Sequence, residues 1–241
     1  LFRSAAVPTT CGTGSEVTPN AVLTRPALKK KGSMTHHVYA ELALVDGKYL
    51  ASAGDKLIIN TAVDALAHLI ESRLSRKSDD YNHMFSEYGL LLWSGLAPYL
   101  TGEKEMKEEV YERLMLTSTV AGMAIAQTGT SLPHALSYPL TLNHNVAHGR
   151  SCGLFLAAYM EECALHRPQD VDRVLSLLQC RNTRALAVVL HRLLGREDIP
   201  GEEMEAMADD MAANAGKLAT CPFEIDREGI LRIITKSLAV R

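Results

Sequence analysis

The sequence has no long uncharged apolar run, no closely spaced pair of cysteines and no excess of basic residues. Without about 18 consecutive apolar residues, no transmembrane helix is expected. The first residues, from Leu1 to Pro8, are too few and too polar for a secretory signal peptide. Because the cysteines are odd in number and scattered, we expect reduced thiols and a cytoplasmic location rather than a disulfide framework. They are Cys11, Cys152, Cys163, Cys180 and Cys221.

Charge and composition narrow the class of protein further. The 241 residues carry a formal net charge of -3, whereas a protein that binds nucleic acid normally presents a basic face to the phosphates. Apolar residues make up 47% and charged residues 22%, as in a soluble globular protein of one large or two small domains. We therefore expect neither a nucleic-acid nor a membrane partner.

The pattern changes near residue 50. Before it, small residues and turn signals surround two short runs, 20–24 and 42–45, that predict strands. After it, the apolar spacing predicts helices almost throughout. Candidate N-caps are Asp226 and one residue of Ser78-Asp79-Asp80, and Pro133 and Pro139 bracket a short predicted helix. Nothing has the alternating strand–helix–strand pattern of a dinucleotide-binding domain. The predicted helices are 55–75, 80–100, 104–127, 131–137, 146–165, 169–178, 183–194, 201–215 and 226–239.

One carboxylate and three histidines are candidate metal ligands: Asp64, His68, His134 and His148. Asp64 and His68 are four residues apart in a predicted helix, so both side chains lie on one face and can hold one ion. Imidazole with a carboxylate suits a borderline divalent metal such as zinc or ferrous iron. A single histidine on an apolar face is more often a core residue, so the prediction depends on the combination.

These residues occur within longer motifs. Pro8-Thr-Thr-Cys-Gly-Thr-Gly-Ser-Glu16 is followed by Val63-Asp-Ala-Leu-Ala-His-Leu-Ile-Glu71, then by Ala121-Gly-Met-Ala124, and then by His134 and His148-Gly149. In type, order and spacing the set resembles the iron-containing, group III, alcohol dehydrogenase family, which shares its fold with dehydroquinate synthase. The resemblance runs through most of the chain.

The resemblance implies a fold class and a domain division. The chain is expected to be mainly α: the helical C-terminal domain of the dehydroquinate synthase-like fold, with a short β/loop segment from the α/β nucleotide-binding domain. Residues 1–50 would be the edge of that nucleotide-binding domain, and residues 51–241 the α-helical metal-binding domain. The Gly-Gly-Gly-Ser loop that holds the NAD(P) pyrophosphate in the family does not occur here, so we expect the rest of the nucleotide-binding domain to be absent from this chain.

The same resemblance implies an activity: hydride transfer between an alcohol or aldehyde and NAD(P), with Fe(2+) or Zn(2+) held by the four ligands. A small alcohol or aldehyde is the expected substrate, and a homodimer is possible. Tyr138 stands where many relatives have a second histidine, and is expected to orient substrate or pass a proton. Residues expected on the cofactor side of the cleft are Thr9, Thr10, Thr13, Lys31 and Leu50.

Two other interpretations stay open at this point. The chain could be a lyase like dehydroquinate synthase, although the nearly neutral segments around the histidines disfavour a site for a strongly acidic substrate. It could also be a helical remnant without catalytic activity, used as an interaction module. Neither the substrate, nor the choice between NAD and NADP, nor the native metal can be read from these residues.

Overall fold

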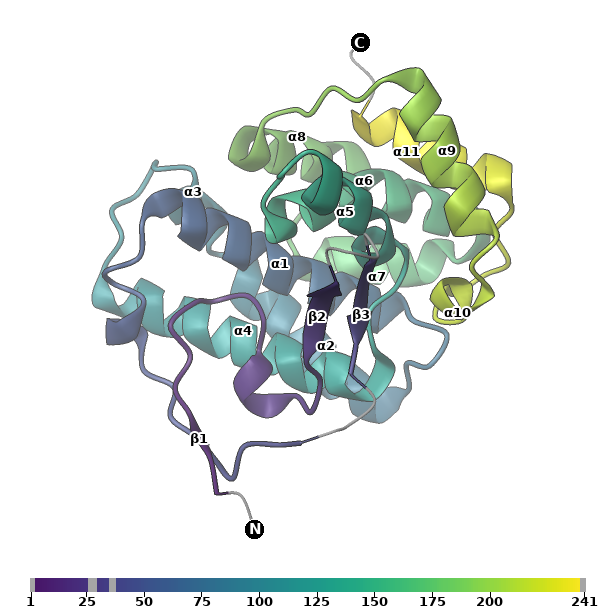
Figure 1. Cartoon of the computed structure of the whole chain (residues 1–241). Coiled ribbons are helices and arrows are strands. Elements are labelled where there is room, and N and C mark those ends of the chain that lie inside the picture. Colours follow the sequence, from purple (N-terminus) through teal and green to yellow (C-terminus); the bar gives the residue numbers. More distant parts are fainter. Residues whose placement is uncertain (1–2, 26–29, 35–37, 239–241) are drawn as a thin grey trace.

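The computed structural model describes residues 3–25, 30–34 and 38–238. The helices gather into one body, and the short strands lie on its surface (Figure 1). β1 (Ala5–Ala6) pairs in parallel with β4 (Leu42–Ala43), and β2 (Val22–Arg25) pairs antiparallel with β3 (Lys30–Ser33). Two 3-10 helices, η1 (Ser15–Val17) and η3 (Gly47–Tyr49), pack against helix α4 (Glu108–Thr128). All described strands therefore lie before residue 50, as the sequence predicts.

Helix α1 (Asp55–Leu74) occupies the centre and packs against α4 and α6 (His148–His166). Every residue from Ala62 to Leu74 is buried. A helix enclosed on all sides normally carries apolar residues all round, so its buried polar side chains need a specific explanation. They are Asp64, His68, Glu71, Ser72 and Arg73.

Helices α2 to α8 contact α1, whereas α11 packs against α6 and α9, and the fold is mainly helical, as predicted. None of the helices described here is long and apolar enough to cross a membrane. The bounds are α2 (Asp80–Ser94), α3 (Ala97–Leu100), α4 (Glu108–Thr128), α5 (Leu132–Asn143), α6 (His148–His166), α7 (Pro168–Leu177), α8 (Thr183–Leu194), α9 (Gly201–Ala212), α10 (Ala215–Leu218) and α11 (Arg227–Leu238).

The predicted N-caps are confirmed. Asp79 accepts a hydrogen bond from the Asn82 N–H at 2.8 Å, and Asp226 accepts one from the Gly229 N–H at 2.8 Å. Each carboxylate satisfies a backbone donor that has no partner within the first helical turn.

Several predicted helix boundaries were wrong: α4 begins at Glu108 rather than near 104, and the segment 201–215 contains α9 and the start of α10. Two further errors involve prolines. The segment 80–100 is two helices, because in a continuous helix Pro98 could not donate to the Ser94 carbonyl. Conversely, α5 continues through Pro139 to Asn143. Pro139 has no backbone N–H and so removes one hydrogen bond of this helix, but packing of α5 along α6 holds the helix together. The last turn is closed by the His144 N–H, which donates to the Leu140 carbonyl at 3.1 Å, an ordinary distance for a backbone hydrogen bond.

Glycines allow two close approaches that bring the site together. A Cβ on Gly14, which has a φ of 56°, would lie 2.4 Å from the Gly122 Cα, so the loop before η1 rests directly on α4. A Cβ on Gly149 would lie 1.9 Å from the Asn60 carbonyl oxygen. Only glycine lets the start of α6 lie this close to the backbone of α1.

Candidate metal centre

Three helices bring the four predicted ligands to one point. Asp64 and His68 come from α1, His134 from the first turn of α5, and His148 is the first residue of α6. The Oδ1 atom of Asp64 lies 3.4 Å from His134 Nε2, 3.9 Å from His148 Nε2 and 4.0 Å from His68 Nε2. The His68 and His134 rings stack with their centroids 4.5 Å apart. The three imidazoles thus surround a single carboxylate oxygen.

Glu71 fixes the orientation of His134. Its Oε1 atom lies 2.6 Å from His134 Nδ1, and its other oxygen accepts the Ser131 N–H. Glu71 is completely buried, so neither bond competes with water. Holding the Nδ1 proton in this way leaves Nε2 with a lone pair that points inward, which is how metal-binding histidines are usually held. The sequence motif contains Glu71, but its position in that motif does not reveal this role.

The other two imidazoles are also contacted through Nδ1. His68 Nδ1 lies 3.1 Å from the Gly12 carbonyl oxygen, and His148 Nδ1 lies 3.4 Å from the Ser137 hydroxyl. The Gly12 contact spans 56 positions of sequence and places the glycine-containing loop beside the site. All three Nε2 atoms are therefore the ones that face Asp64.

Two atoms at the centre lack a hydrogen-bond partner within the described chain: Asp64 Oδ1 and His134 Nε2. Both residues are buried, with exposed fractions of 4% and 3%. An unsatisfied buried polar atom costs about 1–3 kcal/mol. A divalent cation would satisfy both atoms at once, so the donor set fits a metal of the borderline class.

The protonation of Asp64 and His68 also suits a cation. Burial raises the pKa of the Asp64 carboxyl, but the neighbouring imidazoles of His68, His134 and His148 outweigh it and hold that pKa well below its ordinary value. Burial lowers the pKa of His68 and outweighs the attraction of Asp64. An ionised carboxylate beside a neutral imidazole is the protonation state in which both can act as ligands.

His134 shows how strongly the centre attracts positive charge. Burial lowers the pKa of its imidazole, but the neighbouring Cys152, Glu71 and Asp64 together outweigh burial and raise that pKa well above its ordinary value. A proton on His134 Nε2 and a metal ion would therefore compete for the same lone pair. We expect metal binding at this centre to release that proton.

Cys152 is a further candidate donor that the sequence motifs did not reveal, although burial raises the pKa of its thiol and a metal binds the thiolate form. Its Sγ atom lies 3.8 Å from both ring nitrogens of His148, and one donor atom each from Asp64, His134, His148 and Cys152 lie within 4.8 Å of one another. Cys152 is four residues after His148 in α6, and that spacing is the signal that could have revealed it. All five cysteines are free thiols, as expected from their scattered positions.

Tyr138 lies one turn after His134 in α5 and is half-buried. Its ring stacks on that of His148 with the centroids 6.2 Å apart. The Nζ atom of Lys217, in α10, lies 4.4 Å from the centre of the Tyr138 ring. Burial raises the pKa of the Tyr138 hydroxyl, so it stays protonated near neutral pH. Tyr138 is thus beside the candidate metal ligands, within the same site.

The residues predicted to contact a cofactor have different surroundings. Thr9 and Thr13 are exposed and Thr10 is half-buried, and the Thr13 hydroxyl donates to the Ser15 hydroxyl at 3.1 Å. Leu50 is fully buried in the apolar core instead of facing solvent. The Lys31 side chain lies outside the described residues. The contacts of these five residues with a cofactor stay a prediction.

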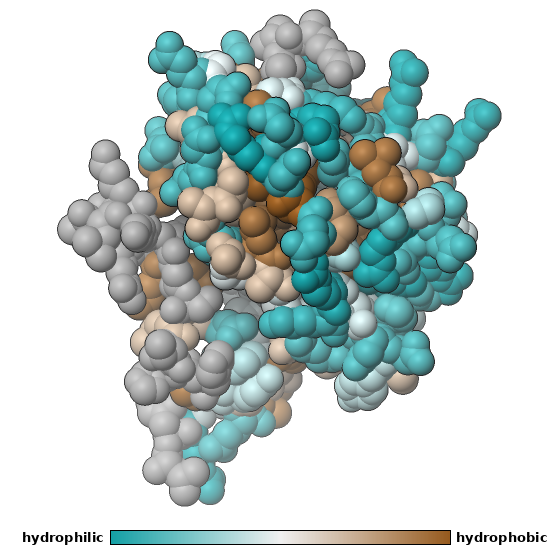
Figure 2. All heavy atoms as spheres, turned by 90° about the vertical axis from the view of Figure 1, so that its right-hand side faces the viewer, coloured by the Kyte–Doolittle hydropathy of each residue, from teal (hydrophilic) through white to brown (hydrophobic). Residues whose placement is uncertain are grey.

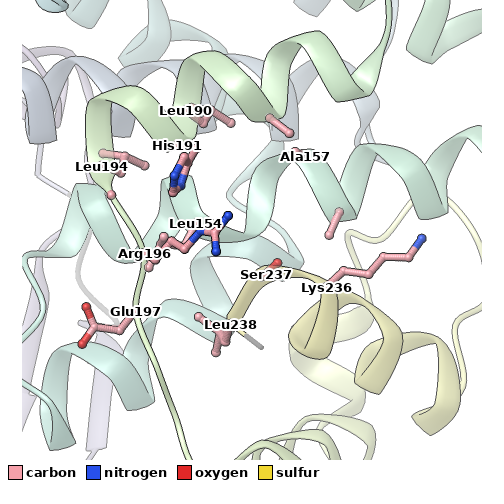
Figure 3. Close-up of a pocket in the computed structure, with 14 residues that line it drawn as sticks. Leu154, Ala157, Leu190, His191, Leu194, Arg196, Glu197, Lys236, Ser237 and Leu238 are labelled. Carbon is pink, nitrogen blue, oxygen red and sulfur yellow. The ribbon is translucent and has the colours of Figure 1, made fainter. Parts of the chain in front are cut away.

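A pocket apart from the metal centre, which we call the second pocket, lies between α6, α8 and the end of α11 (Figure 3). None of the candidate metal ligands lines it. Two of the charges at this pocket already have partners, because Glu197 pairs with Arg150 at 2.5 Å and Lys236 pairs with Glu161 at 2.9 Å. This pocket therefore offers no comparable cluster of unsatisfied donors among the described residues.

Comparison with known proteins assigns the family. The model of the Fe-containing alcohol dehydrogenase family, C-terminal part, matches residues 58–238, and the iron-containing alcohol dehydrogenase model matches residues 2–47. The chain belongs to the iron-containing alcohol dehydrogenase family. It is therefore related to enzymes whose names describe the oxidation of alcohols or the reduction of aldehydes.

Individual relatives agree with this assignment. The chain is 31% identical to 4-hydroxybutyrate dehydrogenase of Clostridium kluyveri, over 95% of this chain and 66% of that protein. It is 28% identical to lactaldehyde reductase of Escherichia coli, over 85% of this chain and 59% of that enzyme. The chain thus spans about two thirds or less of the length of these relatives.

Solved structures show the same fold. An iron-containing alcohol dehydrogenase from Thermotoga maritima superimposes with a TM-score of 0.88 at 32% identity, over 99% of this chain and 64% of the other. Sulfoacetaldehyde reductase from Bifidobacterium kashiwanohense, solved in complex with NAD+, superimposes with a TM-score of 0.84 at 26% identity, over 100% of this chain and 66% of the other.

Proposed function

We propose that this chain is the metal-binding part of an alcohol dehydrogenase that transfers hydride between a small alcohol or aldehyde and NAD(P). The observation that carries the proposal is the convergence of Asp64, His68, His134 and His148, with Asp64 Oδ1 and His134 Nε2 buried and unpartnered. Membership of the iron-containing alcohol dehydrogenase family supports the same activity.

The chain's own residues would prepare the centre for its cation. Asp64 supplies the negative charge, and the three imidazoles supply nitrogen donors. Glu71 and Gly12 hold two of the imidazoles in place, so little rearrangement is needed when the ion binds. Bound Fe(2+) or Zn(2+) supplies Lewis acidity toward an oxygen of the substrate. Zinc normally binds more tightly than ferrous iron, so the metal loaded in an experiment must be controlled.

Tyr138 has the position of a residue that orients substrate. With its pKa raised by burial, its hydroxyl donates a hydrogen bond and is a poor base. NAD(P) would approach from the side of the loop that contains Thr9, Thr10 and Thr13, since Gly12 in that loop contacts His68. The complex of sulfoacetaldehyde reductase with NAD+ supports a nicotinamide cofactor for this fold.

The first test is metal content. Elemental analysis of the purified chain after exposure to zinc or ferrous iron should give about one ion per chain, and His148→Ala should lose it. His191→Ala is the matched control, because His191 is exposed and belongs to the second pocket. Equal metal content in His148→Ala and the unchanged chain would refute the site.

The second test is turnover of NAD(P)H with short aldehydes, measured on the chain joined to the part of a relative that it does not cover. Tyr138→Phe should cost roughly tenfold or less, because a residue that only orients substrate is not the proton donor, whereas general acid–base roles are worth ~100- to 10,000-fold. His134→Ala should lose nearly all activity. An equal collapse in both variants would make Tyr138 the acid–base. No turnover by a metal-loaded protein would favour the lyase or the non-catalytic alternative.

A further inference from the structure

Helix α2 presents a row of large apolar side chains to solvent. After Asp80, its first residue, every exposed residue of this helix is large and apolar. The exposed fractions are 62% for Tyr81, 66% for Met84, 50% for Tyr88 and 48% for Leu91. We call these four residues the α2 stripe. A contiguous apolar row of this kind normally marks a surface that another protein covers.

The α2 stripe is unusual for this molecule. None of the other described α-helices exposes more than one large apolar side chain. Leu165 in α6 and Val188 in α8 are as exposed, at 70% and 64%, but each stands alone, and single exposed apolar residues need no explanation. The surface on the side of α9 and α10 is mainly hydrophilic, with a small hydrophobic patch in its middle (Figure 2). The stripe is therefore the helical surface that most needs a partner.

The spacing of the stripe is the same read from either end. Its members follow one another at intervals of three, four and three positions. Such intervals keep side chains on one helix face and form the seam between two packed helices. When a second copy of α2 runs antiparallel, Tyr81 of each chain lies opposite Leu91 of the other, and Met84 lies opposite Tyr88. Every member of the stripe thus meets an apolar side chain of an identical helix, as a two-fold axis requires.

The two ends of the stripe carry opposite charges. The Asp80 side chain, at the start of α2, is fully exposed. At the other end the Arg113 guanidinium donates to the carbonyl oxygens of Leu91 at 3.2 Å and Leu92 at 2.7 Å. In the antiparallel arrangement the residue opposite Asp80 is Leu92, so each Asp80 carboxylate lies on the side of the other chain's Arg113. A parallel arrangement would instead place the two Asp80 carboxylates opposite each other, where they repel.

We propose that the α2 stripe is the contact between two copies of this chain, which pair antiparallel about a two-fold axis. The four side chains expose on the order of 500 Å², and a standard interface buries about 800 Å² per partner. Leu116 of α4, which is 41% exposed and lines one hollow with Leu92, widens the same face. The apolar spacing and the end charges select a second copy as the partner, because both are self-complementary. The inference depends on neither the metal centre nor the proposed activity.

The state of association in solution is the first test. Sedimentation equilibrium should show a dimer with a Kd at or below about 10 μM. Tyr88→Glu places a carboxylate opposite Met84 at two symmetric positions, and should raise the Kd at least about 100-fold. Val188→Glu is the matched control: it also replaces an exposed apolar helix residue by glutamate, and should change the Kd by no more than about twofold. Circular dichroism checks that both variants are folded.

Cross-linking tests the antiparallel arrangement. Tyr81→Cys and Leu91→Cys are made separately with Cys180→Ser, because Cys180 is half-buried and the other native thiols are buried. Ten positions of helix are about 15 Å long, too far for a disulfide between two copies of either variant. Mild oxidation should therefore link the two variants only when they are mixed. A parallel pair would give the reverse, with each variant linked to itself.

Several results would overturn the inference. A chain that stays monomeric up to about 100 μM would show that a second copy does not cover the stripe. A dimer that survives Tyr88→Glu would have its interface elsewhere, and an equal effect of Val188→Glu would show that the loss is not specific to α2. Self-linked Tyr81→Cys would refute the antiparallel pairing. None of these outcomes depends on turnover or on bound metal, so the inference and the proposed function fail separately.

Discussion

Replacement of Glu71 by glutamine tests how the metal centre is held. In the native chain both Glu71 oxygens are acceptors, one for His134 and one for the Ser131 N–H. A glutamine has one oxygen and one NH2 group, so it must place a donor against one of these two donors. Because Glu71 is fully buried, water cannot relieve the mismatch. We expect His134 to lose its fixed orientation while Asp64, His68 and His148 stay in place.

The size of the effect follows from the role of such partners. Loss of the group that orients a metal-bound histidine lowers metal affinity about 10- to 100-fold, or about 1.4–2.8 kcal/mol. Zinc at about 100 times the native Kd stabilises the native chain by about 2.7 kcal/mol, and the same concentration stabilises Glu71→Gln by only about 1.4 to 0.4 kcal/mol. For a chain of 241 residues, about 2–4 °C per kcal/mol makes the zinc-dependent rise in Tm about 3–9 °C smaller in the variant.

Calorimetric titration with zinc and thermal unfolding with and without zinc measure both quantities. Glu162→Gln is the matched control: Glu162 is also buried, but it pairs with Arg232 on α11, and its loss should leave zinc affinity within about twofold. A Glu71→Gln variant that folds and binds zinc with native affinity would refute the reasoning. So would an equal loss of zinc affinity in the control.

Two further predictions concern stability. Gly149→Ala should lower the free energy of unfolding by about 1–3 kcal/mol, because the new Cβ overlaps the Asn60 carbonyl. Gly201→Ala is the control and should have no such effect, because an added Cβ at Gly201 meets open space. Urea unfolding compares the two variants, and equal effects would contradict the prediction. The hydrogen bond from Arg173 lowers the pKa of the Glu87 carboxyl below its ordinary value of 4.5. The ionised Glu87 therefore stabilises the folded chain above pH 4.5, and this stabilisation is lost as the pH falls below that value. Glu87→Gln should therefore lower Tm at about pH 7 and have less effect near pH 3; a constant difference would count against the ion pair.

Much of the site could be predicted from the sequence because its strongest signals are local. Asp64 and His68 share a helix face whenever that helix forms, and the N-caps Asp79 and Asp226 act within one turn. The types of the four ligands also indicate a metal before their positions are known. The predicted division near residue 50 agrees with the change from strands to helices, and as a domain boundary it stays a prediction.

Tertiary structure decided which other residues join these ligands. Glu71 contacts His134 across 63 positions, and Gly12 contacts His68 across 56, so neither partnership has a periodic signature in the sequence. Lys217 likewise reaches Tyr138 only because α10 packs on α5. The sequence by itself determined the candidate donors and the helix that pairs two of them, since these depend on residue type and short-range spacing. Packing of distant helices determined their orientation and their charged neighbours, since a contact between remote segments exists only once the whole chain has folded.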